Sequence, residues 1–276
     1  MLLPQLGSWH PLRFGPSGED TLLVRREPDL YRIHMPGWLD AELSLDGSSL
    51  NARFIEGASL ESREATLRQI LGPLVAHATG RLVLHAAGVV LDECAVALVG
   101  GSERGKSTLA ALFHERGRAV LADDALPLDV DSHDASASPG SPIVAYPAAA
   151  RVAKLRRPTA DALGRELERD PIGDRQVLQL SPAASTPLGA VFILGDDAPL
   201  EITRLTKQQA LLELVRGCHR VDPGDPALLT RELAQLERLV REIPVYSIRY
   251  PRRFDASAEL IARIEAASKR PAAAPR

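Results

Sequence analysis

The chain has 276 residues and a formal net charge of −3, with 45% hydrophobic and 25% charged residues. These values are ordinary for a soluble globular protein and give no sign of a general affinity for nucleic acid or for an anionic membrane. Cys94 and Cys218 are too few for a disulfide framework or a zinc site, and the first residues lack the basic segment and apolar core of a signal peptide. We therefore expect a cytoplasmic protein without a membrane span.

Residues 1–80 are expected to form a small β-rich N-terminal subdomain with a linking helix. Short alternating segments occur over residues 22–56, and Asp46-Gly47 between two of them predicts a tight antiparallel hairpin. Apolar residues at helical spacing over 67–75 predict the linking helix, in which Pro73 starts a new turn or causes a kink.

Residues 81–268 are expected to form an α/β catalytic domain, followed by a disordered tail at residues 269–276. The elements expected in this domain are strands 82–91 and 95–99, a helix from 108 ended by Gly117, strand 118–122, a surface loop at 131–142, a strand pair at 191–194 and 201–205, a helix opened by the capping box of Thr206 and Gln209, a helix at 228–240, strand 245–249 and a last helix capped by Asp255.

One motif points to a function. The phosphate-binding (Walker A) pattern G-x-x-x-x-G-K-[ST] is matched by Gly100-Gly101-Ser102-Glu103-Arg104-Gly105-Lys106-Ser107. An apolar strand precedes this loop and a helical segment from Thr108 follows it, so backbone N–H groups and the helix dipole would face an anion. Lys106 adds a cation for the β- and γ-phosphates, and the Ser107 hydroxyl can bind magnesium. The sequence therefore predicts a nucleotide site at residues 100–108, with ATP and Mg²⁺ as cofactors.

Two acids and a histidine are candidates for the chemistry. Asp123-Asp124 follows strand 118–122, at the position where an NTPase holds magnesium or activates the attacking group. A turn after a strand also favours aspartate, but the nearby loop favours a functional interpretation. His85 lies in an apolar segment, where a histidine is either a hydrogen-bonded core residue or a catalytic one.

These segments together resemble the catalytic domain of HPr kinase/phosphorylase. The resemblance rests on His85-Ala86-Ala87-Gly88-Val89, on the loop and on residues 116–124, and it is specific over about residues 82–128. The chain is similar in particular to short HPr-kinase-like proteins, some of which phosphorylate lasso-peptide precursors. The resemblance implies a P-loop core in which Lys106 binds the phosphates and Ser107 and Asp123 bind the metal. It also implies that Asp124 is the base for the acceptor hydroxyl and that His85 lies beside the transferring phosphate.

The chain departs from the family pattern at three places. Glu103 stands where the loop usually has glycine, Ala148-Ala149-Ala150 replaces a segment with a metal-binding glutamate, and residues 1–80 differ from the larger N-terminal domain of the full-length enzymes. HPr itself is therefore not the expected substrate.

The sequence predicts a kinase that transfers the γ-phosphoryl group of ATP to a serine-type hydroxyl of a peptide, such as a lasso-peptide precursor. Two alternatives stay open: a nucleotide-binding scaffold or sensor without phosphotransfer, and a small-molecule hydroxyl kinase. Arg104, Arg151 and Arg156 are candidates for an additional cation at the phosphates or are solvated surface charges. A homo-oligomer is compatible with the resemblance, whereas neither nucleic acid nor a membrane is an expected partner.

Overall fold

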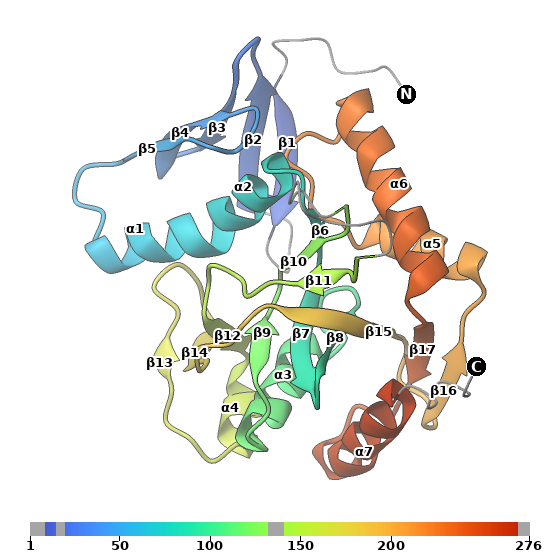
Figure 1. Cartoon of the computed structure of the whole chain (residues 1–276). Coiled ribbons are helices and arrows are strands. Elements are labelled where there is room, and N and C mark those ends of the chain that lie inside the picture. Colours follow the sequence, from blue (N-terminus) through green and yellow to red (C-terminus); the bar gives the residue numbers. More distant parts are fainter. Residues whose placement is uncertain (1–8, 15–19, 132–140, 270–276) are drawn as a thin grey trace.

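The computed structural model describes residues 9–14, 20–131 and 141–269. The N-terminal part is an antiparallel sheet whose five strands follow chain order (Figure 1): β1 (His10–Phe14), β2 (Asp20–Arg26), β3 (Leu30–Met35), β4 (Leu39–Ser44) and β5 (Leu50–Phe54). The predicted hairpin is confirmed, since β4 pairs with β5 and Gly47 has φ +72, a left-handed conformation that glycine adopts at little cost.

The linking helix is longer than predicted and has three parts, α1 (Leu60–Thr66), a π-helical turn (Leu67–Leu71) and α2 (Gly72–Ala78). It begins earlier than expected because the Ser59 side chain accepts the Ser62 N–H and caps the first turn. In the π-turn the Gly72 N–H reaches the Leu67 carbonyl, five residues back. Pro73, which has no N–H, then lies at the start of α2, as the sequence predicted.

The central sheet is mixed. Its strands are β6 (Leu82–Leu84), β7 (Ala86–Leu91), β8 (Cys94–Val99), β9 (Val120–Ala122), β10 (Leu126–Asp129), β11 (Val144–Ala145), β15 (Thr186–Leu194), β16 (Glu201–Arg204) and β17 (Val245–Arg249). They lie in the order β6-β10-β11-β15-β8-β7-β9, with β17 beside β15 and β16 beside β17. Only β8, β15 and β17 are parallel to one another. A third, antiparallel sheet is formed by β12 (Val152–Leu155), β14 (Gln176–Gln179) and β13 (Glu168–Arg169).

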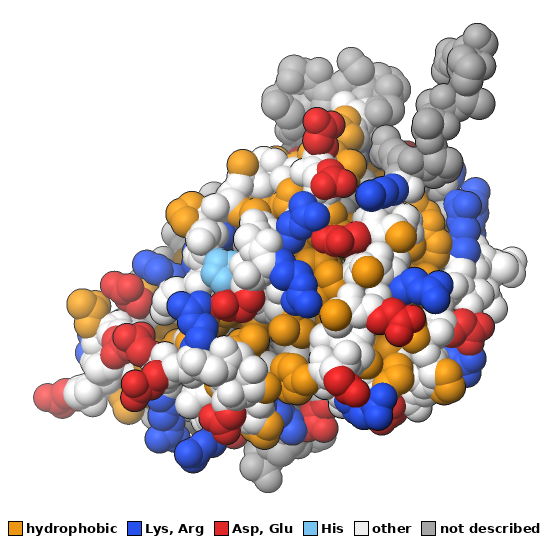
Figure 2. All heavy atoms as spheres, turned by 90° about the horizontal axis from the view of Figure 1, so that it is seen from below, with side chains coloured by type: hydrophobic (Ala, Val, Ile, Leu, Met, Phe, Trp, Pro, Cys, Tyr) orange, Lys and Arg blue, Asp and Glu red, His pale blue; other side chains and the backbone are white. Residues whose placement is uncertain are grey.

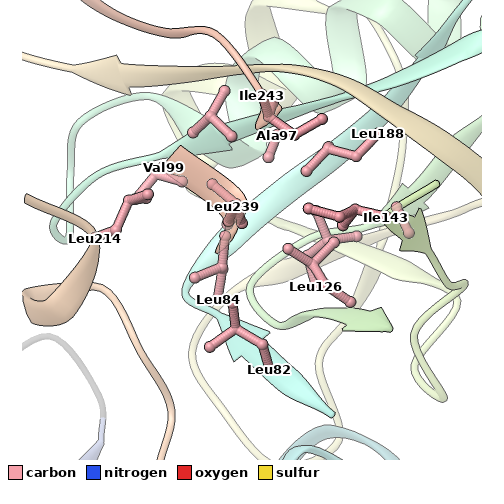
Figure 3. Close-up of a cluster of buried hydrophobic side chains, with 14 of the residues drawn as sticks. Leu82, Leu84, Ala97, Val99, Leu126, Ile143, Leu188, Leu214, Leu239 and Ile243 are labelled. Carbon is pink, nitrogen blue, oxygen red and sulfur yellow. The ribbon is translucent and has the colours of Figure 1, made fainter. Parts of the chain in front are cut away.

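Helices cover both faces of the central sheet: α5 (Lys207–Arg216) and α6 (Pro226–Glu242) lie on one face, and α3 (Lys106–Glu115) and α7 (Ser257–Ser268) lie on the other. Two shorter elements are α4 (Arg157–Ala162) and the 3₁₀ turn η2 (Phe254–Ala256). Alternate residues of β8 point to opposite faces: Ala97 and Val99 pack with α5 and α6 (Figure 3), whereas Val96 and Leu98 pack with α3 and α7. Because both faces of β8 are buried, its carboxyl end is a rigid support for the loop that follows.

Three sequence predictions are corrected. Segment 82–91 is two strands, because the chain changes partners at His85: β6 pairs with β10, whereas β7 pairs with β8 and β9. Strands 191–194 and 201–205 both form but do not pair, because β17 lies between them. Asp255 lies in η2, and α7 begins without a side-chain cap. The capping box of Thr206 and Gln209 is confirmed.

Two further predictions lie partly outside the described residues. They concern the surface loop at 131–142 and the tail at residues 269–276. The division into domains stays a prediction. On the face seen from below Figure 1, basic and acidic side chains are mixed, with hydrophobic side chains between them (Figure 2). Over the described ranges, no helix combines the length and apolar character needed to cross a bilayer.

Candidate functional site

The predicted phosphate loop connects β8 to α3. β8 ends at Val99 and α3 begins at Lys106, so residues 100–105 form the turn at the helix N-terminus. Gly105 has φ +89, and a β-carbon on it would lie 2.3 Å from the Tyr250 hydroxyl oxygen. Glu103 has φ +67, so the position where the chain departs from the family pattern keeps a backbone conformation that favours glycine.

The loop is held by residues that follow β17. The Tyr250 hydroxyl donates to the Arg104 carbonyl at 2.6 Å, and the Arg252 guanidinium donates to the Glu103 carbonyl at 3.4 Å. Burial raises the pKa of the Tyr250 hydroxyl, so Tyr250 remains a hydrogen-bond donor at neutral pH. The loop conformation therefore depends on contacts with a segment far along the chain.

Lys106 points back towards the start of the loop. Its Nζ donates to the carbonyl oxygens of Gly100 at 2.7 Å and Gly101 at 3.1 Å, and it lies 3.0 Å from His85 Nε2. The side chain is buried. Burial lowers the pKa of its ammonium, while the carboxylates of Asp124 and Asp123 oppose the shift. The ammonium is thus held at the carboxyl end of β8.

Asp123 is buried behind the loop. Its Oδ2 accepts the Lys154 backbone N–H at 2.8 Å, while its Oδ1 has no hydrogen-bond partner among the described residues. Burial and the neighbouring Asp124 charge raise the pKa of Asp123 to about 6, against the hydrogen bonds from Lys154 and Ser107. A buried oxygen without a partner is costly unless a ligand or ion satisfies it.

Asp124 faces the cationic side of the site. Its Oδ1 lies 3.4 Å from His85 Nδ1 and its Oδ2 lies 3.7 Å from Lys154 Nζ. Burial alone would raise the pKa of Asp124. The pKa is instead lowered to about 2 by Lys154, by the histidines at 85 and 219 and by Lys106. The carboxylate is therefore ionised at neutral pH. Asp124 has φ +112, which is strained for an L-residue.

Two histidine rings lie beside Asp124. His85 Nδ1 lies 3.3 Å from His219 Nε2, and the rings meet edge to face with centroids 5.2 Å apart. His219 Nε2 lies 3.1 Å from the Asp124 carbonyl oxygen. Burial lowers the pKa of His85 to about 4, so it is neutral at pH 7. We assign its acceptor nitrogen to Nε2, facing the Lys106 ammonium, and its proton to Nδ1, facing the Asp124 carboxylate.

The donors near Asp123 fit a magnesium ion held mainly by a nucleotide. No cluster of three or more His, Cys, Asp or Glu side chains suitable for a metal occurs within the described parts of the chain. Mg²⁺ at a nucleotide site needs only one or two protein oxygens, because phosphates and water complete its octahedron. Asp123 Oδ1 is an unpartnered buried oxygen, and the Ser107 hydroxyl bonds to the same carboxylate. These two residues could therefore hold the ion.

The three arginines suggested by the sequence each have a partner, and Arg156 also lines the cavity that contains Lys106 and Asp124. Arg104 pairs with Asp196 and Arg156 pairs with Glu103. Arg151 donates to the carbonyl oxygens of residues 120 and 121. None of these contacts places a guanidinium against Lys106 or Asp124.

Sequence reasoning missed Lys154 and His219. Lys154 comes from β12, 30 residues after Asp124, and His219 follows α5. Neither lies in a motif, and only the fold places them at the acid. The scarcity of lysine in this chain was the one available signal for Lys154.

The predicted residues line a large cavity. Its volume is about 940 Å³, and its walls include Ser102, Glu103 and residues 105–108 of the loop, with His85, Asp124, Lys154 and His219. This size is within the range of about 300–1,000 Å³ typical of small-ligand sites. The structure thus brings the predicted loop, histidine and second acid to one cavity, while Asp123 lies behind it.

Comparisons with known proteins add little. No protein-family model matches the chain, and a search of curated proteins finds no match. Among solved structures, the chain is similar to HPr(Ser) kinase/phosphatase from Coxiella burnetii, with 12% sequence identity and a TM-score of 0.36 over 67% of this chain and 95% of that chain. Agreement of this degree defines neither fold nor activity, so the function proposed below rests on the residues of this chain.

Proposed function

We propose that the protein is an ATP-dependent kinase that transfers the γ-phosphoryl group to a serine-type hydroxyl of a peptide, such as a lasso-peptide precursor. The observation that carries this proposal is the contact series from Lys106 through His85 to Asp124, which joins the phosphate loop to an ionised acid at one cavity. A protein that only binds nucleotide has no need of an acceptor-side acid at that position.

Each residue of the site would have a separate role in phosphate transfer. The loop N–H groups and the Lys106 ammonium stabilise negative charge on the phosphates, as in other phosphoryl-transfer sites. Asp124, ionised because its pKa is about 2, orients the acceptor hydroxyl and takes its proton as transfer proceeds. Neutral His85 fixes the relative positions of Lys106 and Asp124 without adding charge. Mg²⁺, held by Ser107 and Asp123 when bound, would neutralise phosphate charge.

The test is phosphate transfer from γ-labelled ATP to a panel of serine-containing peptides, with ATP affinity measured separately. Asp124→Asn should lower the transfer rate about 10²- to 10⁴-fold and leave ATP affinity within a few-fold. Lys106→Ala should lower both. The control is Asp161→Asn, on an exposed position of α4 outside the site. An Asp124→Asn variant as active as the wild type would refute the assignment.

Two other functions make different predictions. A nucleotide-binding scaffold would bind ATP tightly and transfer phosphate to no acceptor, and the glutamate at position 103 favours it. A small-molecule kinase would release ADP with hydroxyl metabolites and ignore the peptides.

A further inference from the structure

A second cavity, of about 490 Å³, lies on the other side of Asp124. Asp124 and Lys154 line both cavities, whereas Lys106 and Ser107 line only the larger one. A base that receives the acceptor proton must touch the acceptor while it faces the transferring phosphate. Asp124 meets this condition, because its carboxylate is common to the walls of both cavities.

Small residues form two facing parts of the wall of this smaller cavity. One wall is the linking helix, where a β-carbon on Gly72 would lie 3.2 Å from the β-carbon of Ala149. The opposite wall is residues 147–150, including the three alanines that stand where the resembling family has a glutamate. Both walls lie outside residues 82–128, over which the resemblance is specific. The shape of this cavity is therefore a property of this chain.

The cavity also presents a cation for recognition. The Arg81 guanidinium lies 4.1 Å from the centroid of the Tyr146 ring, and its side chain has no hydrogen bond or ion pair with any described residue. Arg68 lines the same cavity but pairs with Glu64 across one helical turn. Besides the acids at 123 and 124, Asp129 is the only acid among the lining residues. Arg81, held over an aromatic ring, has N–H groups that a carboxylate can accept.

Building on the proposed kinase function, we propose that this cavity is the acceptor subsite. It takes a short extended peptide segment whose hydroxyl reaches Asp124 and whose carboxylate pairs with Arg81. In the reaction the hydroxyl oxygen bonds to the γ-phosphorus, and its proton passes to Asp124. The bond from the γ-phosphorus to the bridging oxygen breaks, and ADP leaves with that electron pair. The narrow walls exclude a bulky side chain beside the hydroxyl.

The experiment compares three peptides of one sequence. The first has a C-terminal carboxylate next to the serine, the second has an aspartate there and an amidated end, and the third has neither acid. Arg81→Gln should raise KM at least about tenfold for at least one of the two acidic peptides, because a charge-assisted hydrogen bond is lost. The same variant should leave KM for the third unchanged, and Arg81→Lys should recover part of the loss. Ala149→Leu should raise KM for all three.

Matched controls are Arg204→Gln and Ala227→Leu, both at exposed positions away from the two cavities. Transfer with wild-type KM in Arg81→Gln and Ala149→Leu would overturn the subsite and leave the kinase proposal standing. If no peptide is phosphorylated, direct peptide binding to the ADP-loaded protein decides. Binding of the acidic peptides that is lost in Arg81→Gln would support the subsite and refute the kinase reaction, whereas absence of binding would overturn the subsite.

Discussion

Gly105→Ala tests the contact between the phosphate loop and Tyr250. The φ of +89 costs an L-residue about 1–2 kcal/mol. The new β-carbon would lie 2.3 Å from the Tyr250 hydroxyl oxygen, so the hydroxyl must move and lose its bond to the Arg104 carbonyl, worth about 0.5–1.5 kcal/mol. We expect the free energy of unfolding to fall by about 1.5–3.5 kcal/mol, measured by denaturant titration. Stability equal to that of the wild type would refute this reasoning.

A double-mutant cycle with Tyr250→Phe separates the two effects. Without the hydroxyl, the nearest atom to the new β-carbon is Tyr250 Cζ at 3.6 Å, an ordinary contact. Alanine at position 105 then costs only the backbone strain. The double variant should therefore lose about 0.5–1.5 kcal/mol less than the sum of the single losses. Additive losses would show that the hydroxyl and the β-carbon do not compete for the same space.

The other predictions concern the charged groups of the site. Glu103→Gly should change the free energy of unfolding by less than about 1 kcal/mol, because relief at φ +67 offsets the lost pair with Arg156; a larger loss would show that the pair matters more than the backbone. The His85 imidazole should titrate near pH 4, seen by NMR, rather than near 6.5. Because only the unfolded chain binds that proton between these values, the contribution of His85 to stability should fall as pH drops from 6.5 to 4. A His85 midpoint above 6 would contradict its burial.

The sequence-based predictions were right where the signal is local. A glycine loop between an apolar run and a helix, the Thr206–Gln209 capping box and the Asp46-Gly47 turn each depend on residues a few positions apart. Such patterns determine hydrogen bonds and dihedral angles among residues that are a few positions apart. The positions of β8, α3 and the hairpin therefore follow from the amino-acid sequence alone.

The predictions failed where distant segments decide the outcome. β17 is about 40 residues from β16 and pairs between it and β15, which no local pattern records. The strand expected over residues 82–91 is interrupted at His85, whose backbone N–H donates to the Gly217 carbonyl, far along the chain. Lys154 and His219 likewise reach Asp124 from segments that are distant in sequence. The acid and Lys106 were predictable from their neighbours in sequence, but Lys154 and His219, which also lower the pKa of Asp124, were not.

The strained backbone at Asp124 affects which substitutions at this position would be enriched when variants are selected for stability. With φ at +112, glycine would fit this position with less strain than any residue with a side chain. Asp124→Gly would relieve this strain but would also remove the carboxylate whose pKa the surrounding groups lower, and with it a contribution to stability at neutral pH. A library screened for thermal resistance should therefore favour glycine here more strongly in acid, where that contribution is lost, than at neutral pH.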